Sequence, residues 1–449
     1  MVTKSITREF LRFLFFKEES PISRYITAIF GFTVSVNNKE ANQLNKQILV
    51  IGNGFDLSCG LDSRYSDFFE YRFIELFGKQ KSHEQIRLWL NSQLGRDAWS
   101  NKRIDYFKVN QNKWPKGITR WDCIFLFAEE FLNNAEVKQW QNIENIIFNV
   151  VSFVLLPNDG SKSFQSNLHF KESCDGEIYK QKQFIQMVNS FAGAEIDSLE
   201  HKANNLLHDL NDFEKVFAKY IVKECDKEKN YRGEAGELLK ALANWYVEKD
   251  NQLDVISFNY SLDARFGQMM KDDQFRLNSW TNIHGVANYN NKNAKHYINS
   301  IQGTRLKKLP SPIFGIDNHD ILEDSFDNDL RLLFTKSYRL VNSEIHSQIS
   351  SSICSDCDAI IFYGHSLGRA DYSYFETLFD DSNLYHSKTR LIFYYFEGDT
   401  PLENRERYTS NVVSLLTNYG QTLSSIHGEN IVNKLVLEHR LEVLPYPKF

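Results

Sequence analysis

The chain has 449 residues, of which 42% are hydrophobic and 24% charged, and this balance is that of a globular protein large enough for two or three domains. Its formal net charge of −6 provides no overall attraction to nucleic acid or to an anionic membrane surface. The sequence shows neither a secretory pattern nor an apolar run long enough to span a bilayer, so we expect a cytoplasmic protein.

The cysteines do not indicate a metal site. Six of them are spread along the chain, as reduced thiols of a cytosolic protein would be. Cys354 and Cys357 form a single C-x-x-C, without the second pair or the histidines that a zinc site needs. We therefore expect no metal.

The first predicted strand begins near residue 45. Residues 1–44 are expected to form an N-terminal arm or packing extension, and 45–449 the main domain. Ile48–Ile51 is a short apolar run rich in β-branched residues, typical of a buried strand. Gly52, Gly54 and Gly60 follow it at once, so a tight strand-to-helix turn able to cradle a phosphate is predicted there.

Helical patterns dominate the next part of the chain, and we expect a helical insertion over about 70–250. Tyr65–Phe77 opens this pattern, with aromatic residues at helical spacing. Asp56, at the start of the preceding turn, is predicted to cap a helix. Glu144, beside the apolar face of a later helix, is predicted to be a solvated or hydrogen-bonded charge rather than a catalytic acid.

Strand patterns then return, alternating with helices, which predicts an α/β fold with a mostly parallel, Rossmann-like sheet. The expected strands are Leu253–Phe258, Trp280–Ile283, Asp358–Tyr363 and Arg390–Phe396, with short strands at Ile313–Ile316 and Lys434–Leu437. An amphipathic helix is predicted over Leu330–Ile349. Polar residues gather at the predicted strand ends, where parallel sheets bind ligands. They are Gly52 to Asp56, Asn259, His284, Gly364 to Ser366, and Asp399.

Four motifs in order carry a family resemblance. GNGFDLSCGLDSRYSDF, VISFNYSLDARF, IHG and IIFYGHSLGRADYSYF together resemble the AbiH family of bacterial abortive-infection proteins, over roughly 45–380. AbiH proteins in turn resemble the sirtuin-type NAD-binding fold, which carries G-A-G-x-S-x-x-x-G, T-Q-N-I-D, H-G and G-T-S-L. The resemblance implies an antiphage effector with a sirtuin-like Rossmann domain that takes NAD as substrate.

The same resemblance implies a site. It assigns catalysis to His284 as the base and Asn259 as the orienting amide. A histidine suits the base because its pKa ordinarily lies near neutral pH. The residues expected to contact the nucleotide are Gly52, Asn53, Gly54, Asp56, Gly60, Gly364, Ser366 and Asp371.

Two residues depart from the sirtuin pattern. Asp56 stands where sirtuins have Ser, and Ser261 stands where the strand end T-Q-N-I-D has Asp. The four-cysteine zinc module of deacylating sirtuins is also absent. The resemblance therefore implies NAD hydrolysis to nicotinamide and ADP-ribose rather than protein deacylation.

Two alternatives stay open. GHSLG after a predicted strand matches a nucleophile elbow, so a serine hydrolase using Ser366, Asp399 and either His427 or His439 is possible. The fold could instead bind a nucleotide or ADP-ribose as a non-catalytic sensor. In each case we expect a homo-oligomer, a phage trigger or a co-encoded partner protein to control the effector; nucleic acid and membrane partners are not indicated.

Overall fold

A computed structural model gives the structure of the chain, in which Asn45–Phe449 forms one compact unit. The predicted N-terminal arm, 1–44, lies outside the described residues. The structure describes residues 46–79, 84–86, 88, 92, 104–132, 140–156, 168–171, 176–243, 252–263, 266–267, 276–287, 312–322, 328–342, 356–424 and 427–447.

Six strands form one sheet in the order β3-β2-β1-β4-β5-β6, and every neighbouring pair is parallel. The strands are β1 (Lys46–Ile51), β2 (Gln252–Ser257), β3 (Arg276–Asn282), β4 (Ala359–Tyr363), β5 (Arg390–Tyr395) and β6 (Leu441–Pro445). The predicted α/β class with a mostly parallel sheet is confirmed. This strand order is that of doubly wound dinucleotide-binding folds. The finer sirtuin likeness stays a prediction.

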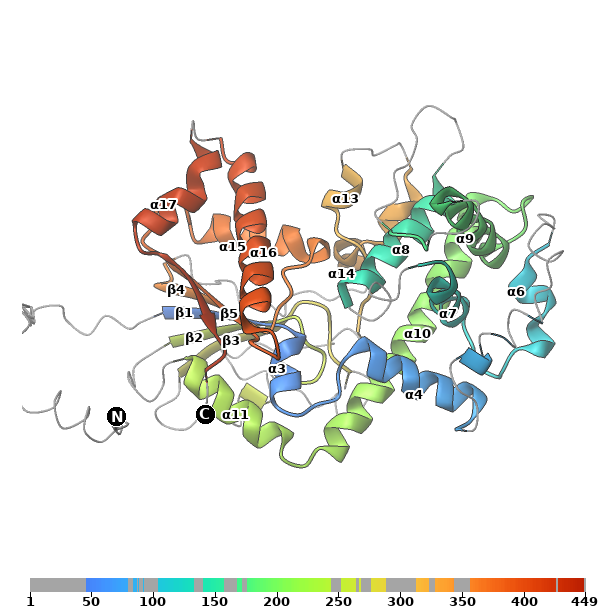
Figure 1. Ribbon diagram of the computed structural model, residues 1–449, viewed down its shortest axis with the longest axis horizontal. Helices are drawn as coiled ribbons and strands as arrows, with labels where there is room; N and C mark the ends of the chain where they lie inside the picture. Colours follow the sequence, from blue (N-terminus) through green and yellow to red (C-terminus); the bar gives the residue numbers. More distant parts are fainter. Residues whose placement is uncertain are drawn as a thin grey trace, which may run out of the picture. The chain divides into compact units, whose positions relative to one another are not determined.

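Both faces of the sheet are covered, which explains why β1 is a continuous apolar run. Ile48 and Val50 face a core shared with α15 (Tyr372–Asp381), α16 (Pro401–Thr422) and α17 (Ile431–Leu437). Leu49 and Ile51 face the other core, against α11 (Tyr231–Leu242). Figure 1 shows α15 to α17 on one side of the strands and α11 on the other.

Between β1 and β2 the described chain is mostly helical. A separate aromatic-rich core holds this helical block together, with buried rings of Tyr65, Phe68, Phe125 and Phe213 in edge or tilted contact. The helices of this block are α4 (Tyr65–Phe77), α6 (Tyr106–Val109), η1 (Gln111–Lys113), α7 (Arg120–Phe131), α8 (Trp140–Leu155), α9 (Glu177–Ala192) and α10 (Leu199–Lys227). The helices α3 (Asn53–Ser58) and α11, which also lie between β1 and β2, pack in the core of the sheet instead. The later helical pieces are α13 (His319–Leu322), η5 (Leu330–Phe334), α14 (Lys336–Asn342), η6 (Arg369–Asp371), α15, α16, η7 (Gly428–Asn430) and α17.

Three predicted elements differ in the structure. Ile313–Ile316 forms only a single bridge, from Ile316 to Thr335, and not a strand. That bridge interrupts the helix predicted over Leu330–Ile349, which is split into η5 and α14; residues 343–349 lie outside the described part.

The predicted last strand, Lys434–Leu437, is also wrong, because these residues belong to helix α17. Ile431 and Leu435 are both buried, and their spacing of four residues places them on one helical face. The last strand is β6, which pairs with β5.

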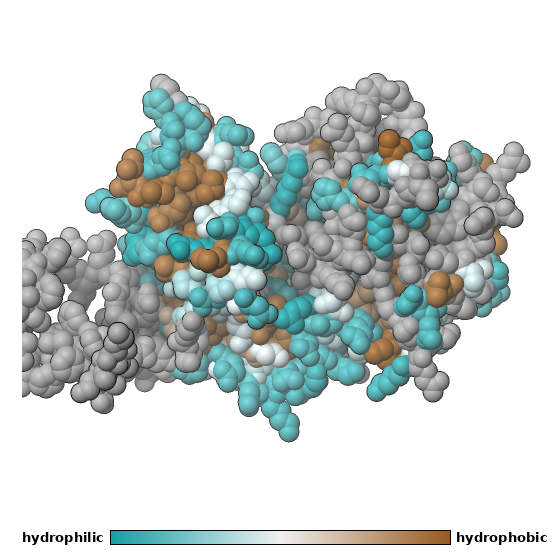
Figure 2. Space-filling model, viewed as in Figure 1, coloured by the Kyte–Doolittle hydropathy of each residue, from teal (hydrophilic) through white to brown (hydrophobic). Residues whose placement is uncertain are grey.

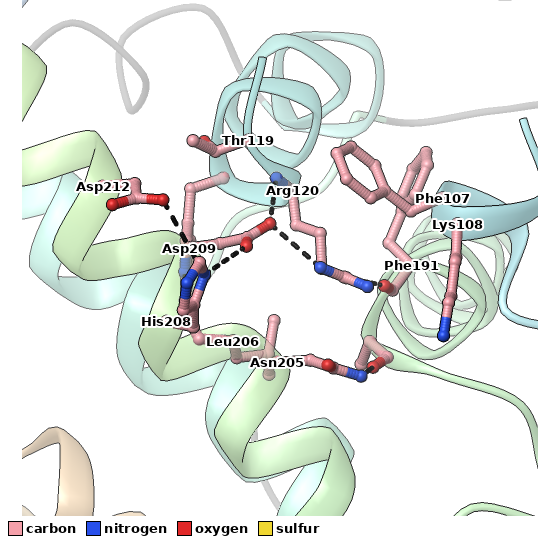
Figure 3. Close-up of polar contacts among 12 residues, drawn as sticks. Phe107, Lys108, Thr119, Arg120, Phe191, Asn205, Leu206, His208, Asp209 and Asp212 are labelled. Atoms are coloured by element: carbon pink, nitrogen blue, oxygen red, sulfur yellow. Dashed lines mark hydrogen bonds and ion pairs between the residues drawn. The ribbon is translucent and has the colours of Figure 1, made fainter. Parts of the chain in front are cut away.

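A buried arginine joins several parts of the helical block (Figure 3). The guanidinium of Arg120 donates to Asp209 at 3.1 Å, to Asp105 at 3.1 Å and to the carbonyl of Phe191 at 2.7 Å. It also lies 4.7 Å from the ring centroid of Phe107. Asp209 in addition accepts the backbone N–H of Arg120 at 2.8 Å. The Asp209 carboxylate therefore accepts hydrogen bonds from both the backbone N–H and the guanidinium of the first residue of α7.

The surface carries an apolar patch in the region of α17, visible in Figure 2. Val436 and Leu437 of that helix are 54% and 79% exposed. The expected homo-oligomer stays a prediction.

Among the described residues no helix has both the length and the apolar composition needed to cross a membrane.

We predict that Asp209→Ala lowers the free energy of unfolding by about 3–5 kcal/mol, because it leaves the buried Arg120 charge without its main partner. Urea unfolding measures the change. Asp212→Ala, one turn further along α10 at an exposed carboxylate, is the matched control and should cost less than about 1 kcal/mol. Equal effects of the two substitutions would contradict a structural role for the Arg120 network.

Candidate functional site

A cavity of about 270 Å³ lies at the carboxyl ends of the strands. It is bordered by the segments that follow β1, β2, β3 and β4. In the order β3-β2-β1-β4-β5-β6 the direction of chain progression reverses between β1 and β4, and doubly wound sheets bind ligands beside such a reversal. Seven predicted site residues border this cavity, namely Asn53, Asp56, Asn259, His284, Gly364, Ser366 and Asp371.

Gly52 and Gly54 do not border the cavity, and packing explains their lack of side chains. A Cβ on Gly52 would lie 2.6 Å from Cα of His365, and one on Gly54 would lie 2.6 Å from Cα of Gly364. The N–H of Gly54 donates to the carbonyl of Gly364 at 2.7 Å. Gly60 has φ +80°, and no atom lies within 4 Å of the place that a methyl group would take, so its backbone conformation is what favours glycine. The two turns at the reversal point therefore pack backbone against backbone.

Asp56 is fully buried and does not cap a helix, contrary to the prediction. Its Oδ1 accepts hydrogen bonds from Tyr231 Oη at 2.8 Å and Asn259 Nδ2 at 3.0 Å, and its Oδ2 accepts one from Ser261 Oγ at 2.7 Å. Burial raises the pKa of Asp56 to about 6, although these three donors lower it. At neutral pH the carboxylate is therefore charged.

The two residues at which the sequence departs from the sirtuin pattern are in direct contact. Asp56 follows β1, Ser261 follows β2, and the two side chains share the 2.7 Å hydrogen bond. Tyr231, the first residue of α11, completes the arrangement, and no sequence motif marked it.

A second polar cluster is centred on Asp371. Its Oδ1 accepts from Lys336 Nζ at 2.8 Å and lies 3.2 Å from Nε2 of His284, a contact without hydrogen-bond alignment. Its Oδ2 lies 3.2 Å from Nε2 of His365. Because Nδ1 of His365 accepts the N–H of Leu367 at 2.9 Å, the ring proton resides on Nε2 and faces Asp371.

Lys336 links this cluster to the helical block. Its ammonium also pairs with the carboxylate of Glu144 on α8, so one buried cation contacts two carboxylates. Glu144 borders the cavity and is hydrogen-bonded, one of the two possibilities predicted for it. No sequence motif marked Lys336 as a site residue. It begins α14, and only the tertiary fold buries it.

Burial and the neighbouring charges together set the pKa values of His284, Glu144 and Asp371. Burial, with a further contribution from Lys336, lowers the pKa of His284 to about 4. Burial raises the pKa of Glu144 to about 7. Asp371 has a pKa well below its usual range, because Lys336 and the histidines outweigh burial. His284 is consequently neutral near pH 7 and a weaker base than the sequence suggested.

The serine-hydrolase arrangement is not assembled in the described residues. Ser366 borders the cavity, yet no hydrogen bond joins its hydroxyl to a histidine in that part of the chain. His427 is 70% exposed and lies 3.8 Å from Glu429. Asp399 is exposed as well.

The sheet defines a doubly wound α/β protein with a cavity at the point where the strand order reverses. The chain belongs to the AbiH family: the family model described as "Bacteriophage abortive infection AbiH" matches residues 48–395. The matched residues begin in β1, end with β5 and include all seven cavity residues predicted from the sequence. Neither a curated protein nor a solved structure matches the chain. The family membership indicates an antiphage role.

We predict a pH-dependent difference in stability between the wild type and Asp56→Asn. The folded-state pKa of Asp56 is raised from 3.8 to about 6, so its stabilising contribution is complete below the unfolded pKa and is lost as pH rises through 6. The wild type should therefore lose about 2 kcal/mol relative to Asp56→Asn between about pH 4.5 and about pH 7.

Denaturant unfolding of both proteins across this range measures the difference. Groups that titrate alike in both proteins, such as His284 and Glu144, cancel from it. A pH-independent difference would show that Asp56 is not perturbed by burial.

Proposed function

We propose that this AbiH chain is an antiphage effector that hydrolyses NAD to nicotinamide and ADP-ribose in the cavity at the strand ends. One observation carries the proposal. Asp56, Asn259, His284 and Ser366, which are far apart in the sequence, border a single cavity at the reversal point of a sheet with dinucleotide-binding strand order.

The charges of the cavity favour a ligand that is cationic at one end and anionic at the other. Asp56, Glu144 and Asp371 line it, and the buried Lys336 offsets only part of their charge. Arg64 also lines it, and its side chain is 59% exposed, so this cation lies where the cavity reaches solvent. NAD has a cationic nicotinamide ring and an anionic pyrophosphate, which matches this polarity.

The size of the cavity suits a ligand of which only one part is enclosed. At about 270 Å³ it is smaller than the roughly 300–1,000 Å³ of sites that enclose a whole drug-sized ligand. We therefore place the nicotinamide and its ribose inside, beside the carboxylates. The pyrophosphate and adenosine extend towards Arg64 and solvent.

The reaction breaks the bond between the nicotinamide nitrogen and C1′ of ribose, and the electron pair leaves with nicotinamide as a neutral molecule. The positive charge moves onto the ribose, where the Asp56 carboxylate stabilises it, as in glycoside hydrolysis. A water oxygen bonds to C1′ and releases a proton. Neutral His284 accepts that proton, and Asp371, 3.2 Å from its Nε2, stabilises the imidazolium that results.

One observation favours a second candidate, a nucleotide-binding sensor without catalysis. A histidine with a pKa of about 4 is a weak base at neutral pH. In that case the same cavity binds NAD or ADP-ribose and the signal passes to a partner.

In either form we propose that the protein works in the cytoplasm, where NAD is available. A toxic activity needs an off state, so we also propose control by homo-oligomerisation, a phage trigger or a co-encoded partner protein.

We predict that His284→Ala and Asn259→Ala each lower NAD turnover by at least about 100-fold without unfolding the protein, because the first removes the base and the second the orienting amide. NAD loss and nicotinamide release from purified protein, with phage lysate added as trigger, provide the measurement. His208→Ala, at an exposed histidine of α10, is the matched control and should retain full turnover. Full turnover in both site variants would exclude this mechanism, whereas wild-type binding without cleavage would favour the sensor.

We also predict that the cavity binds oxidised NAD at least about tenfold more tightly than NADH, because only the oxidised ring is cationic. Calorimetry with His284→Ala avoids turnover during the measurement. Adding Asp56→Asn should bring the affinities for oxidised NAD and NADH closer together, since it removes the cavity carboxylate that Lys336 does not contact. Equal affinities for the two forms would refute the charge argument.

A further inference from the structure

A second cavity, of about 650 Å³, lies next to the first. Its lining residues come from α16 and, facing it, from α8, α13 and the η6–α15 segment, so we call it the groove. Glu144 is the one residue shared with the first cavity among the described lining residues. The groove takes no part in the function proposed above.

The α16 wall is uncharged and rich in side-chain amides. Asn411, Ser414, Asn418 and Gln421 line the groove, and their spacing of three and four residues places them on one helical face. The hydroxyl of Ser414 and the amides of Asn418 and Gln421 form no hydrogen bond with another described residue. Asn and Ser are also weak helix formers, so this face is not explained by helix stability.

The opposite wall carries aromatic rings and a cation. His319 and Tyr372 both line the groove, with ring centroids 5.4 Å apart. Arg369 also lines the groove, and so does the Glu144 carboxylate, which pairs with Lys336. Side-chain amides, which offer a donor and an acceptor together, suit the edge of adenine; rings suit its face; and a guanidinium suits a phosphate.

The loop after β4 forms the wall between the two cavities. Gly364 to Ser366 and Asp371 border the first cavity, and 367–370 border the groove. Leu367 has φ +59°, a conformation that a leucine rarely adopts. Its N–H is held by Nδ1 of His365, whose other nitrogen faces Asp371.

From these contacts we propose that the groove is a second ligand site, for an adenine mononucleotide, and that its occupancy is transmitted to the first cavity through the 364–371 loop. The base lies against the amides of α16 and the phosphate against Arg369. A ligand on the Leu367 side displaces the strained loop, and with it the His365 and Asp371 contacts. By linkage, a ligand in the first cavity changes the affinity of the groove to the same degree.

Binding of AMP to the full chain tests the site. Calorimetry should show saturable binding that is weakened at least about tenfold in the double variant Asn418→Ala, Gln421→Ala, since two hydrogen-bonding side chains are removed. Both substitutions raise helix propensity, so α16 should stay folded. Ser410→Ala, on α16 but outside the groove lining, is the matched control and should bind AMP as the wild type does.

A second variant separates this proposal from the function proposed for the first cavity. Asn259→Ala should leave AMP binding unchanged, whether or not the protein cleaves NAD. If AMP fails to bind, or if binding is lost in Asn259→Ala and kept in the α16 double variant, the groove is not an adenine nucleotide site.

Histidine NMR signals test the coupling without any need for NAD. AMP should shift the imidazole resonances of His365 in the wild type and in Ser410→Ala, and the α16 double variant should need at least about tenfold more AMP for the same shift. AMP binding with no change at His365 would refute transmission through the loop.

Discussion

The site depends on one close approach, between the turn that follows β1 and the turn that follows β4. Gly54 donates its N–H to the carbonyl of Gly364 at 2.7 Å, and neither residue has room for a side chain. This contact sets how near Asp56 can come to the loop that carries His365 and Asp371. A methyl group at Gly52 or Gly54 would separate the two turns and widen the cavity between them.

Buried charge is the second constraint, and Lys336 balances it. Two carboxylates, Glu144 and Asp371, are stable in the interior because one ammonium contacts both. Burial lowers the pKa of His284, the same ammonium lowers it further, and the imidazole is therefore neutral near pH 7. Since Glu144 comes from the helical block and Asp371 from the segment after β4, this charge network also fixes the block to the sheet.

Asp56 is buried among hydrogen-bond donors from other segments of the chain. Ser261, which follows the neighbouring strand β2, has its hydroxyl 2.7 Å from the Asp56 carboxylate. Tyr231 and Asn259 then hold it in place, so the donors around the carboxylate come from two further segments.

The sequence by itself determined the fold class, four of the strands close to their bounds, and seven of the residues that line the cavity. Those features are local or periodic, since apolar β-branched runs make buried strands and parallel strands bring their ends to one edge. The predictions of two short strands and of one long helix from Leu330 were wrong. Their local patterns were weak, and tertiary contacts decided the structure of these segments.

Only the tertiary structure decided the partners of Asp56, the burial of Lys336 and Glu144, and the low pKa of His284. Each depends on which side chains from distant segments lie within hydrogen-bonding range and on how much water they exclude, and neither quantity is encoded in residue spacing.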